Sequence, residues 1–567
     1  MTQITGGRAV VDALAAQDVR HVFGLIGSAG MEIFDALFEH PTVGFVGVRD
    51  ERTGTHMADG YARASGRAGV IIAGQNGPGA TNLVTGLSQA LAAYSPVVAL
   101  AGSLSSAHVT RDAFQEVDQV ALFKPVTKKT WQVPQARRIG ELMREAFRTA
   151  LAPRQGPVLL NLPRDLLAET FEASSGWEPA GECLASGPAG APALIERAAR
   201  LLADAQRPLI LAGGGVKNGR HAAVVLELAE RLGVPVATSP GHGDAIPCTH
   251  PLYAGQVGPR GNPLATALAK EADVILALGT RLGFNTTFYS YEHLSSSARI
   301  VQVEIEPTAI GRFFPVAVGI LGDAGLVARA LTGALSGHAV GAPVREWTAS
   351  FQSRRAALLE ERDRPSTGDA ARAIQPHDLY RALRAVAPDD TMYTMDAGTL
   401  CLQATDQMRY VQPPALFSPL DFGLVGFSYA CGLGAKVAVP GRTVVSLMGD
   451  GGFGMTASEL GTAVAHRIPT VCVVMNNGCW GAEKAYQRDF FGGRFLGADV
   501  PNPPYDRLAE LWGAAGFRVD RVADLEPTIA AAIRCGRPAV VDVMIDPDAL
   551  YSFRRDSFKH RDPSASK

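Results

Sequence analysis

Short apolar segments alternate with amphipathic segments along most of the chain. Near the N-terminus, several apolar runs bounded by glycine or proline have the length of buried strands: "HVFGLIG", "TVGFVGV", "RAGVIIAG" and "SPVVALAG". Stretches with helical periodicity, such as "GTHMADGYARASG" and "TNLVTGLSQALAAY", lie between them. Strands that alternate with helices predict an α/β fold, in which a parallel sheet is covered by helices on both faces.

The same alternation recurs in two later parts of the chain. The parts are separated by segments whose composition is typical of linkers, "EASSGWEPAGECLASGPAGAPA" and "RDRPSTGDAARAIQP". We therefore expect three doubly wound parallel-sheet domains of similar size. Their expected limits are residues 1–172, 190–336 and 372–552, followed by a C-terminal tail at 553–567.

Composition excludes several classes of protein. The 567 residues are 47% hydrophobic and 19% charged, with a formal net charge of -2 and no segment dominated by lysine and arginine, which argues against a nucleic-acid partner. No apolar stretch approaches the roughly 18 residues that span a bilayer, and no secretory signal is visible. The seven cysteines are scattered and never spaced C-x-x-C. We expect a reduced, cytoplasmic protein without a membrane partner.

The most informative stretch is "LMGDGGFGMTASELGTAVAHRIPTVCVVMNN", which predicts a strand, a glycine turn, a helix and a second strand. The turn fits the G-x-G-x-x-G pattern of dinucleotide sites, but such a site needs an acid at the end of the second strand to hold the ribose. That strand ends in Asn476 and Asn477 instead. Asp450 and Asn477 then follow adjacent parallel strands, where their oxygens suit Mg²⁺ or Ca²⁺ beside a diphosphate.

A G-D-G motif followed about two dozen residues later by N-N resembles the signature of thiamin diphosphate (ThDP) enzymes. The domain order resembles the branch of acetohydroxyacid synthases and 2-oxo acid decarboxylases, which implies pyrimidine-binding, middle and diphosphate-binding domains. The implied cofactors are ThDP and Mg²⁺. The resemblance assigns the metal to Asp450, the Asn477 side chain and the backbone carbonyl of Cys479, and it assigns Gly451 and Gly452 to the diphosphate.

A second motif lies far upstream, in "VRDERTGTHMADGYARASG". By the same resemblance, Glu51 is the catalytic residue: it bonds the ring nitrogen of the aminopyrimidine and favours the tautomer that removes the thiazolium proton. Taken alone, Glu51 fits a solvated acid at a helix N-terminus better. Its combination with "GPGATNLVTGL" and with the distant G-D-G…N-N motif favours the catalytic role instead. The segment "DFGLVGFSYACGLGAK" resembles the part of the family that bends the cofactor, with Val425 as the apolar wedge and Gly423 offering its carbonyl. Gly398 and Thr399 would add contacts to the diphosphate.

Other stretches resemble the sulfoacetaldehyde acetyltransferase family. They are "IGSA", "GQNGPG", the C-terminal "FRRDSFKHR" and, most specifically, W-G-A-E-K in "GCWGAEKAYQRDFFGGRFLGADV". The resemblance implies that sulfoacetaldehyde and phosphate are converted into acetyl phosphate and sulfite. FAD is not expected, because "LGTRLGFNTT" stands where the FAD-associated R-F-D-D-R would be found.

A sulfonate and a phosphate need cationic or hydrogen-bonding side chains. The candidates for substrate contacts are Ile26, Gln115, Lys484, Arg488 and Arg554, with Lys128, Arg494 and Arg555 as further cations. Each cation taken singly fits a solvated surface position equally well. We expect His56 to pack inside a helix face, and His466 to cap a helix end.

The resemblance places the catalytic glutamate and the metal site in different subunits. It therefore implies a homodimer or homotetramer with active sites at the dimer interface. Three alternatives stay open. The first is an acetolactate synthase-like enzyme or 2-oxo acid decarboxylase that acts on pyruvate or a related 2-oxo acid. The others are a nicotinamide oxidoreductase and a non-catalytic relative.

Overall fold

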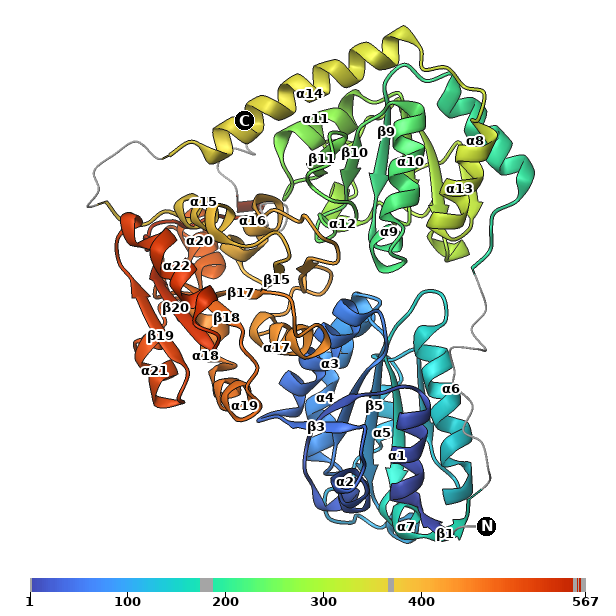
Figure 1. Ribbon diagram of the computed structural model, residues 1–567, viewed down its shortest axis with the longest axis vertical. Coiled ribbons are helices and arrows are strands. Elements are labelled where there is room, and N and C mark those ends of the chain that lie inside the picture. Colours follow the sequence, from blue (N-terminus) through green and yellow to red (C-terminus); the bar gives the residue numbers. More distant parts are fainter. Residues whose placement is uncertain (1–2, 174–186, 366–371, 554–557, 559, 562–567) are drawn as a thin grey trace.

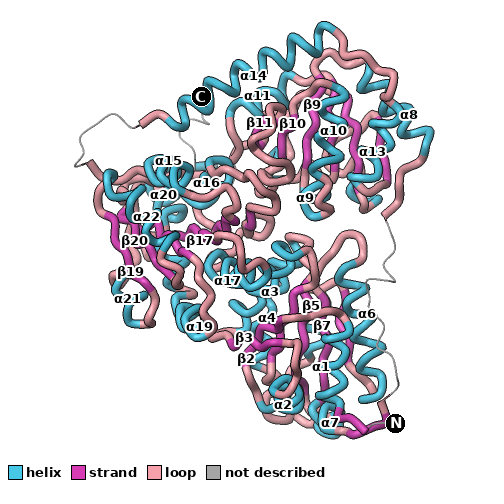
Figure 2. Tube along the Cα trace, in the orientation of Figure 1, coloured by secondary structure: helices cyan, strands magenta, loops and turns pink. Residues whose placement is uncertain are grey.

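The computed structural model describes residues 3–173, 187–365, 372–553, 558 and 560–561. In this part of the chain the strands form three six-stranded sheets and one two-stranded antiparallel pair. Every strand pair inside the large sheets is parallel. Helices cover both faces of each large sheet (Figures 1 and 2). The predicted α/β class with three doubly wound parallel sheets is confirmed.

The first sheet has the order β3-β2-β4-β5-β7-β6. Its strands are β2 (His21–Leu25), β3 (Gly44–Gly47), β4 (Gly69–Ala73), β5 (Val97–Ser103), β6 (Lys129–Gln132) and β7 (Val158–Pro163). The helices are α1 (Gly6–Ala16), α2 (Met31–Phe38), α3 (Glu51–Ser65), α4 (Pro78–Ala92), α5 (Gln119–Phe123), α6 (Ile139–Leu151) and α7 (Arg164–Ala168). Strands β1 (Gln3–Thr5) and β8 (Thr170–Glu172) pair beside them. Strands β4 and β5 are buried throughout, since helices cover both of their faces.

The middle sheet has the order β11-β10-β9-β12-β13-β14. Its strands are β9 (Pro208–Ala212), β10 (Val236–Thr238), β11 (Tyr253–Gln256), β12 (Val274–Leu278), β13 (Arg299–Glu304) and β14 (Val318–Leu321). The helices are α8 (Pro192–Ala203), α9 (Gly214–Asn218), α10 (Ala222–Leu232), α11 (Pro263–Glu271), α12 (Phe284–Thr287) and α13 (Ala324–Ala334). The long helix α14 (Ala342–Asp363) then runs across this domain toward the third one (Figure 1).

The third sheet has the order β16-β15-β17-β18-β20-β19. Its strands are β15 (Met392–Met395), β16 (Leu416–Phe417), β17 (Val444–Gly449), β18 (Val471–Asn476), β19 (Ala515–Val519) and β20 (Ala539–Met544). The helices are α15 (Pro376–Val386), α16 (Thr399–Gln407), α17 (Ser428–Ala438), α18 (Asp450–Gly454), α19 (Leu460–Ala465), α20 (Gly481–Phe490), α21 (Tyr505–Leu511) and α22 (Leu525–Arg534). Strand β17 lies between β15 and β18, so the segments that follow these three strands meet at one edge.

The first and third domains pack together through α3 and α17, which lie side by side (Figure 1). A Cβ placed on Gly60 would be 2.0 Å from the carbonyl oxygen of Cys431, and a Cβ placed on Gly434 would be 1.8 Å from that of Met57. The pairing of these positions shows that the helices run antiparallel. The glycines allow the two backbones to touch, and one buried apolar cluster continues across the contact.

The structure also addresses two expectations drawn from composition, the lack of a membrane-spanning segment and the state of the cysteines. No helix in the described ranges is long and apolar enough to cross a membrane. The cysteines that fall within those ranges are free thiols.

Gly434→Ala tests the close approach of α3 and α17. The methyl group would collide with backbone rather than with a movable side chain, so we expect a loss of about 2 kcal/mol in stability, which is typical of overpacking. Differential scanning calorimetry measures the lowered thermal midpoint. Gly441→Ala is the matched control, because a Cβ there meets nothing within 4 Å. Equal midpoints for the two variants would contradict the helix contact.

Candidate active site

The parallel register of the third sheet brings the two halves of the G-D-G…N-N motif together. Strands β17 and β18 pair so that Gly449 lies opposite Met475. Asp450 and Asn477 therefore leave neighbouring strands at the same edge. The expected glycine turn after β17 is in fact a short helix, α18, which begins at Asp450 itself.

Three polar groups converge at this edge. The end of the Asn477 carboxamide lies 3.2 Å from Oδ1 of Asp450 and 3.2 Å from the carbonyl oxygen of Cys479; an amide nitrogen at this point would donate to both, whereas an amide oxygen would share a cation with them. Oxygens so placed repel one another unless a cation lies between them or the amide turns to donate. Neighbouring ligands of octahedral Mg²⁺ are about 2.9 Å apart, given metal–oxygen distances near 2.1 Å. The donor set therefore fits Mg²⁺.

Asp450 is held by further contacts on the side away from these oxygens. Its Oδ2 accepts a hydrogen bond of 2.6 Å from Nδ2 of Asn502, and its backbone carbonyl accepts one of 2.8 Å from the hydroxyl of Tyr505. Tyr505 also donates to Oδ1 of Asn502, at 2.7 Å. Burial raises the pKa of Asp450 to about 6. A cation would offset the cost of this buried negative charge.

Asp396 organises the loop that carries the predicted wedge. This aspartate follows β15 and is fully buried, and its carboxylate accepts hydrogen bonds from the backbone N–H groups of Gly426, at 3.0 Å, and Phe427, at 2.9 Å. A Cβ on Gly452 would lie 2.2 Å from Asp396 Oδ2 and 3.3 Å from a methyl group of Val425. Val425 and Gly452 are thereby brought together. Burial raises the pKa of Asp396 to about 6.

The remaining glycines of the predicted diphosphate site have distinct surroundings. A Cβ on Gly451 would press into the Trp480 ring at 2.6 Å. Gly398 and Gly423 have φ values of +115° and +78°, which favour glycine, and a Cβ on either would meet nothing within 4 Å. Space therefore remains for a ligand next to both of them.

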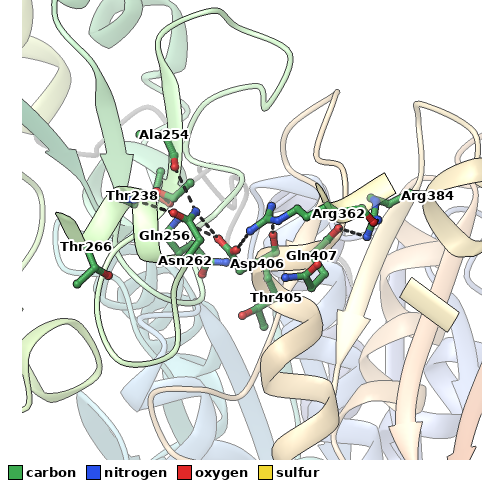
Figure 3. Close-up of polar contacts among 12 residues, drawn as sticks. Thr238, Ala254, Gln256, Asn262, Thr266, Arg362, Arg384, Thr405, Asp406 and Gln407 are labelled. Atoms are coloured by element: carbon green, nitrogen blue, oxygen red, sulfur yellow. Dashed lines mark hydrogen bonds and ion pairs between the residues drawn. The ribbon is translucent and has the colours of Figure 1, made fainter. Parts of the chain in front are cut away.

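Gly398 caps the N-terminus of α16, and Thr399 is the first residue of that helix. The opposite end of α16 is fixed to the middle domain through Asp406 (Figure 3). Its Oδ1 accepts hydrogen bonds of 3.1 Å from Nδ2 of Asn262 and from the backbone N–H of Gln256. Its Oδ2 pairs with the guanidinium of Arg362 on α14. The middle domain thus sets where the N-terminus of α16 points.

Glu51 begins α3 in the first domain and is almost fully buried. Its Oε2 accepts a hydrogen bond of 2.9 Å from Nδ2 of Asn82 on α4, and its Oε1 lies 3.0 Å from where a Cβ on Gly79 would be. Burial is the main cause that raises the pKa of Glu51. A carboxyl with a raised pKa is suited to sharing a proton near neutral pH.

Glu51 and the diphosphate half of the site lie apart within one chain. The antiparallel pairing of α3 and α17 puts Glu51 and Val425 at opposite ends of the helix pair, separated by about 20 Å at 1.5 Å per residue. The residues around Glu51 contact the third domain elsewhere: Glu459 accepts hydrogen bonds from the Thr53 hydroxyl and from the backbone N–H of Arg49. The predicted site residues therefore form two groups that lie apart in one chain, the predicted half-sites of Glu51 and of Asp450.

The candidate substrate residues are dispersed. The side-chain oxygen of Gln115 accepts a hydrogen bond from Nε2 of Gln75, in the loop that precedes α4. Ile26 follows β2 and is 58% exposed. Lys484 pairs with Asp499, at 2.7 Å, and stands over the Phe495 ring. Arg488 pairs with Asp489 at 2.7 Å. Arg554 and Arg555 lie outside the described residues.

One further expectation needs correction. The ammonium of Lys128, expected as a cation for the substrate, donates to the carbonyls of Thr149, at 2.6 Å, and Ala152, at 3.3 Å, so it stabilises the end of α6. His466 is the C-cap residue of α19, as expected, and its Nε2 also accepts a hydrogen bond of 3.1 Å from the backbone N–H of Gly47 in the first domain. His56, as expected, is buried, and it packs edge-on against a phenylalanine of the third domain.

A cavity of about 620 Å³ lies at the carboxyl ends of the middle-domain strands. It is bordered by glycines after β9 and β12, by Glu304 at the end of β13, and by the loop that contains Gly423. Arg154 and Arg281, which also line it, already pair with Glu306 and Asp421. The sequence analysis expects no FAD in this protein, and that expectation stays a prediction.

Comparison with known families identifies the class. Models of the thiamine pyrophosphate enzyme family match in all three domains: the N-terminal TPP binding domain at residues 4–122, the central domain at 195–331 and the C-terminal TPP binding domain at 396–543. The chain belongs to the thiamine pyrophosphate enzyme family. Both outer domains are of the type that binds this cofactor, so the dinucleotide alternative for the G-D-G turn is not supported.

Individual relatives resemble the chain along nearly its whole length. It is 35% identical to a sulfoacetaldehyde acetyltransferase of Castellaniella defragrans, and 34% identical to one of Alcaligenes xylosoxydans xylosoxydans; each comparison covers 98% of this chain and 95% of the relative. It is also 33% identical to a probable acetolactate synthase large subunit of Methanococcus aeolicus, over 97% of this chain and 93% of the relative.

The residues that sequence reasoning missed are mostly supports. Asn502, Tyr505 and Asn82 position the predicted functional carboxylates, and Trp480 covers Gly451. Trp480 stands inside the W-G-A-E-K motif, so a signal for it was present. Asn502 and Tyr505 lie in "PNPPYD", which carries no recognisable motif.

Asp450→Ala tests the oxygen cluster. We expect the affinity for ThDP in the presence of Mg²⁺ to fall at least about tenfold, because even residues behind a metal ligand have effects of that size. Asn502→Ala, which removes the donor behind Asp450, should lower it less. Isothermal titration calorimetry of the apoprotein with ThDP and Mg²⁺ measures both. Asp520→Ala, at an exposed turn, is the control; unchanged ThDP affinity in Asp450→Ala would contradict the assignment.

Proposed function

We propose that the protein is a ThDP- and Mg²⁺-dependent acetyltransferase that converts sulfoacetaldehyde and phosphate into acetyl phosphate and sulfite. The convergence of oxygens from Asp450, Asn477 and Cys479 is the observation that supports the cofactor site. The choice of reaction is supported by the similarity to sulfoacetaldehyde acetyltransferases over 98% of the chain.

We further propose that the active protein is a homodimer, or a homotetramer built from such dimers, in the cytoplasm. The separation of Glu51 from Asp450 and Asn477 in one chain supports this assembly, because a second copy would bring the two groups together. Both halves are also rimmed by exposed apolar side chains. These are Ile26, Met31, Val109 and Phe114 in the first domain, and Phe422, Met455 and Leu496 in the third.

The residues of the chain would divide the work as follows. When bound, ThDP supplies a carbanion at its thiazolium ring, which the protein's side chains cannot provide. Asp450, Asn477 and the Cys479 carbonyl would hold Mg²⁺ and through it the diphosphate. Val425, which lies near Gly452, would offer the cofactor an apolar contact.

Glu51 would manage the proton on the aminopyrimidine. Asn82 donates to Oε2 of Glu51, so Oε1 is the oxygen left to share a proton with the ring nitrogen. Burial keeps water away from this pair and raises the pKa of the carboxyl. Glu51 would therefore hold a proton at Oε1 for the ring nitrogen when the cofactor is bound.

Cationic side chains near Asp450 and Asn477 would bind the anionic parts of the substrates. Lys484 and Arg488 lie on α20, directly after the loop that contains Cys479. Both are engaged by aspartates in the free chain, so an anion would compete with Asp499 and Asp489 for them. Arg494 follows the same helix.

A product assay decides between this reaction and its nearest rival. Purified protein is incubated with ThDP, Mg²⁺ and phosphate, with sulfoacetaldehyde in one tube and pyruvate in another. Sulfite and acetyl phosphate formed only with phosphate present support the proposal. Acetolactate or carbon dioxide from pyruvate, without sulfite, would instead favour an acetolactate synthase-like or decarboxylating enzyme, the alternative supported by the 33% identity to a probable acetolactate synthase.

Glu51→Gln tests the proton-handling role. The amide cannot share a proton with the ring nitrogen, so we expect kcat to fall roughly 100-fold or more, as for other general acid–base groups. ThDP binding measured by calorimetry should persist, because the metal site is untouched. Glu141→Gln, an exposed glutamate on α6, is the control. Turnover of Glu51→Gln at the wild-type rate would refute the assignment.

A further inference from the structure

Gln75 links two loops at the carboxyl edge of the first sheet. It follows β4, and its Oε1 accepts hydrogen bonds from the backbone N–H of Ser28, at 2.9 Å, and from the Ser28 hydroxyl, at 3.0 Å. Its Nε2 donates to Oε1 of Gln115 at 2.5 Å, and more weakly to Oδ1 of Asn76 at 3.4 Å. Gln75 therefore bridges the loop after β2 and the loop after β5.

These contacts fix the direction of two amide groups. A backbone N–H can only donate, so the atom of Gln75 that faces Ser28 has to be the oxygen. The Gln75 nitrogen must then face Gln115 and donate to it, so the Gln115 atom that accepts this hydrogen bond is the side-chain oxygen. The NH₂ group of Gln115 is consequently turned away from Gln75. Within the described residues, Nε2 of Gln115 donates no hydrogen bond.

The backbone of Gln115 is held as firmly as its side chain. Its φ is +64°, a left-handed conformation that is rare for residues other than glycine. Its carbonyl accepts a hydrogen bond of 3.1 Å from Nδ2 of Asn76. A Cβ on Gly77 would lie 2.5 Å from that carbonyl, so Gly77 is required for the close approach. Strain maintained by several contacts is common at functional sites.

This arrangement lies directly beside the catalytic glutamate. A Cβ on Gly79 would be 3.0 Å from Glu51 Oε1 and 3.0 Å from Gln75 Cβ, so the two side chains flank the same glycine. The free NH₂ of Gln115 belongs to the half-site that would face the reacting end of the cofactor. An N–H donor in such a place favours an anionic oxygen over a cationic or donor group.

We propose that Gln75 is a positioning residue which fixes the Gln115 carboxamide so that its NH₂ group donates to an anionic oxygen of the substrate. The group bound is a tetrahedral oxyanion, either the sulfonate of the aldehyde or the incoming phosphate. The inference rests on the proposed function, which it deepens by assigning polarity to one wall of the site.

Calorimetric titrations of the ThDP- and Mg²⁺-loaded protein test the proposal without turnover. Isethionate, the unreactive alcohol corresponding to sulfoacetaldehyde, is the sulfonate probe, and inorganic phosphate is titrated separately. Gln75→Glu keeps the bond to Ser28 but accepts from Gln115, which must turn its oxygen toward the site. We expect at least one probe to bind about tenfold more weakly, as when a hydrogen bond to a charged group is lost; the probe affected identifies the oxyanion.

A double-mutant cycle separates positioning from a direct charge effect. Gln115→Met should weaken the same probe about tenfold, and adding Gln75→Glu to it should weaken binding no further, because Gln75 acts through Gln115. Gln352→Glu, an exposed change of equal charge on α14, should have no effect. The affinity for ThDP and Mg²⁺, measured by calorimetry, should stay unchanged in Gln75→Glu, because the proposed metal and diphosphate contacts come from the third domain.

Several results would overturn the inference. They are a wild-type protein that binds neither probe, unchanged affinity for both probes in Gln75→Glu, or additive effects in the double variant. The proposed function has a separate test: absence of sulfite release by the wild type would contradict that function, while a weaker probe in Gln75→Glu would still support the positioning role.

Discussion

The convergence of three polar groups at one edge of the third sheet is the constraint on which the site depends. Asp450, Asn477 and the Cys479 carbonyl meet there, and they can all present oxygen atoms only when a cation lies between them. They stay together because β17 and β18 are neighbouring parallel strands whose carboxyl ends cannot separate. Asn502 and Tyr505 fix Asp450 from behind, so the cost of the arrangement is met by hydrogen bonds that lie outside the cluster.

Buried carboxylates recur around the site, and each is compensated differently. Asp396 receives two backbone N–H groups, and it thereby shapes the loop on which Val425 is placed. Asp406 receives donors from the middle domain and a guanidinium from α14. Asp450 has only one side-chain donor on its outer oxygen, Asn502, and its inner oxygen faces other oxygens. A carboxylate compensated on one side alone is suited to a ligand that brings positive charge.

Strand order explains how much of this could be predicted from the sequence. The spacing of Asp450 and Asn477 is local to one strand–helix–strand unit, so parallel pairing was enough to place them together. Asp396 lies only two residues before Gly398, which the sequence did single out, yet its bonds to Gly426 and Phe427 depend on a loop some 30 residues away. Lys128 and Gln115 were both candidates for substrate contacts, but in the folded chain Lys128 caps the end of α6 and Gln115 bonds Gln75, in the loop that precedes α4.

The direction of an amide cannot be read from a sequence, because oxygen and nitrogen occupy the same space. In Gln115 it follows from a chain of partners that begins at a backbone N–H of Ser28 and passes through Gln75. The loops that carry these residues follow β2, β4 and β5, which are adjacent in the sheet although they are far apart along the chain. Under the proposed function, the first domain would set polarity around Glu51, as the third domain would set charge around Asp450. These two groups of residues lie apart in one chain, so assembly of two copies would be the step that brings them into one site.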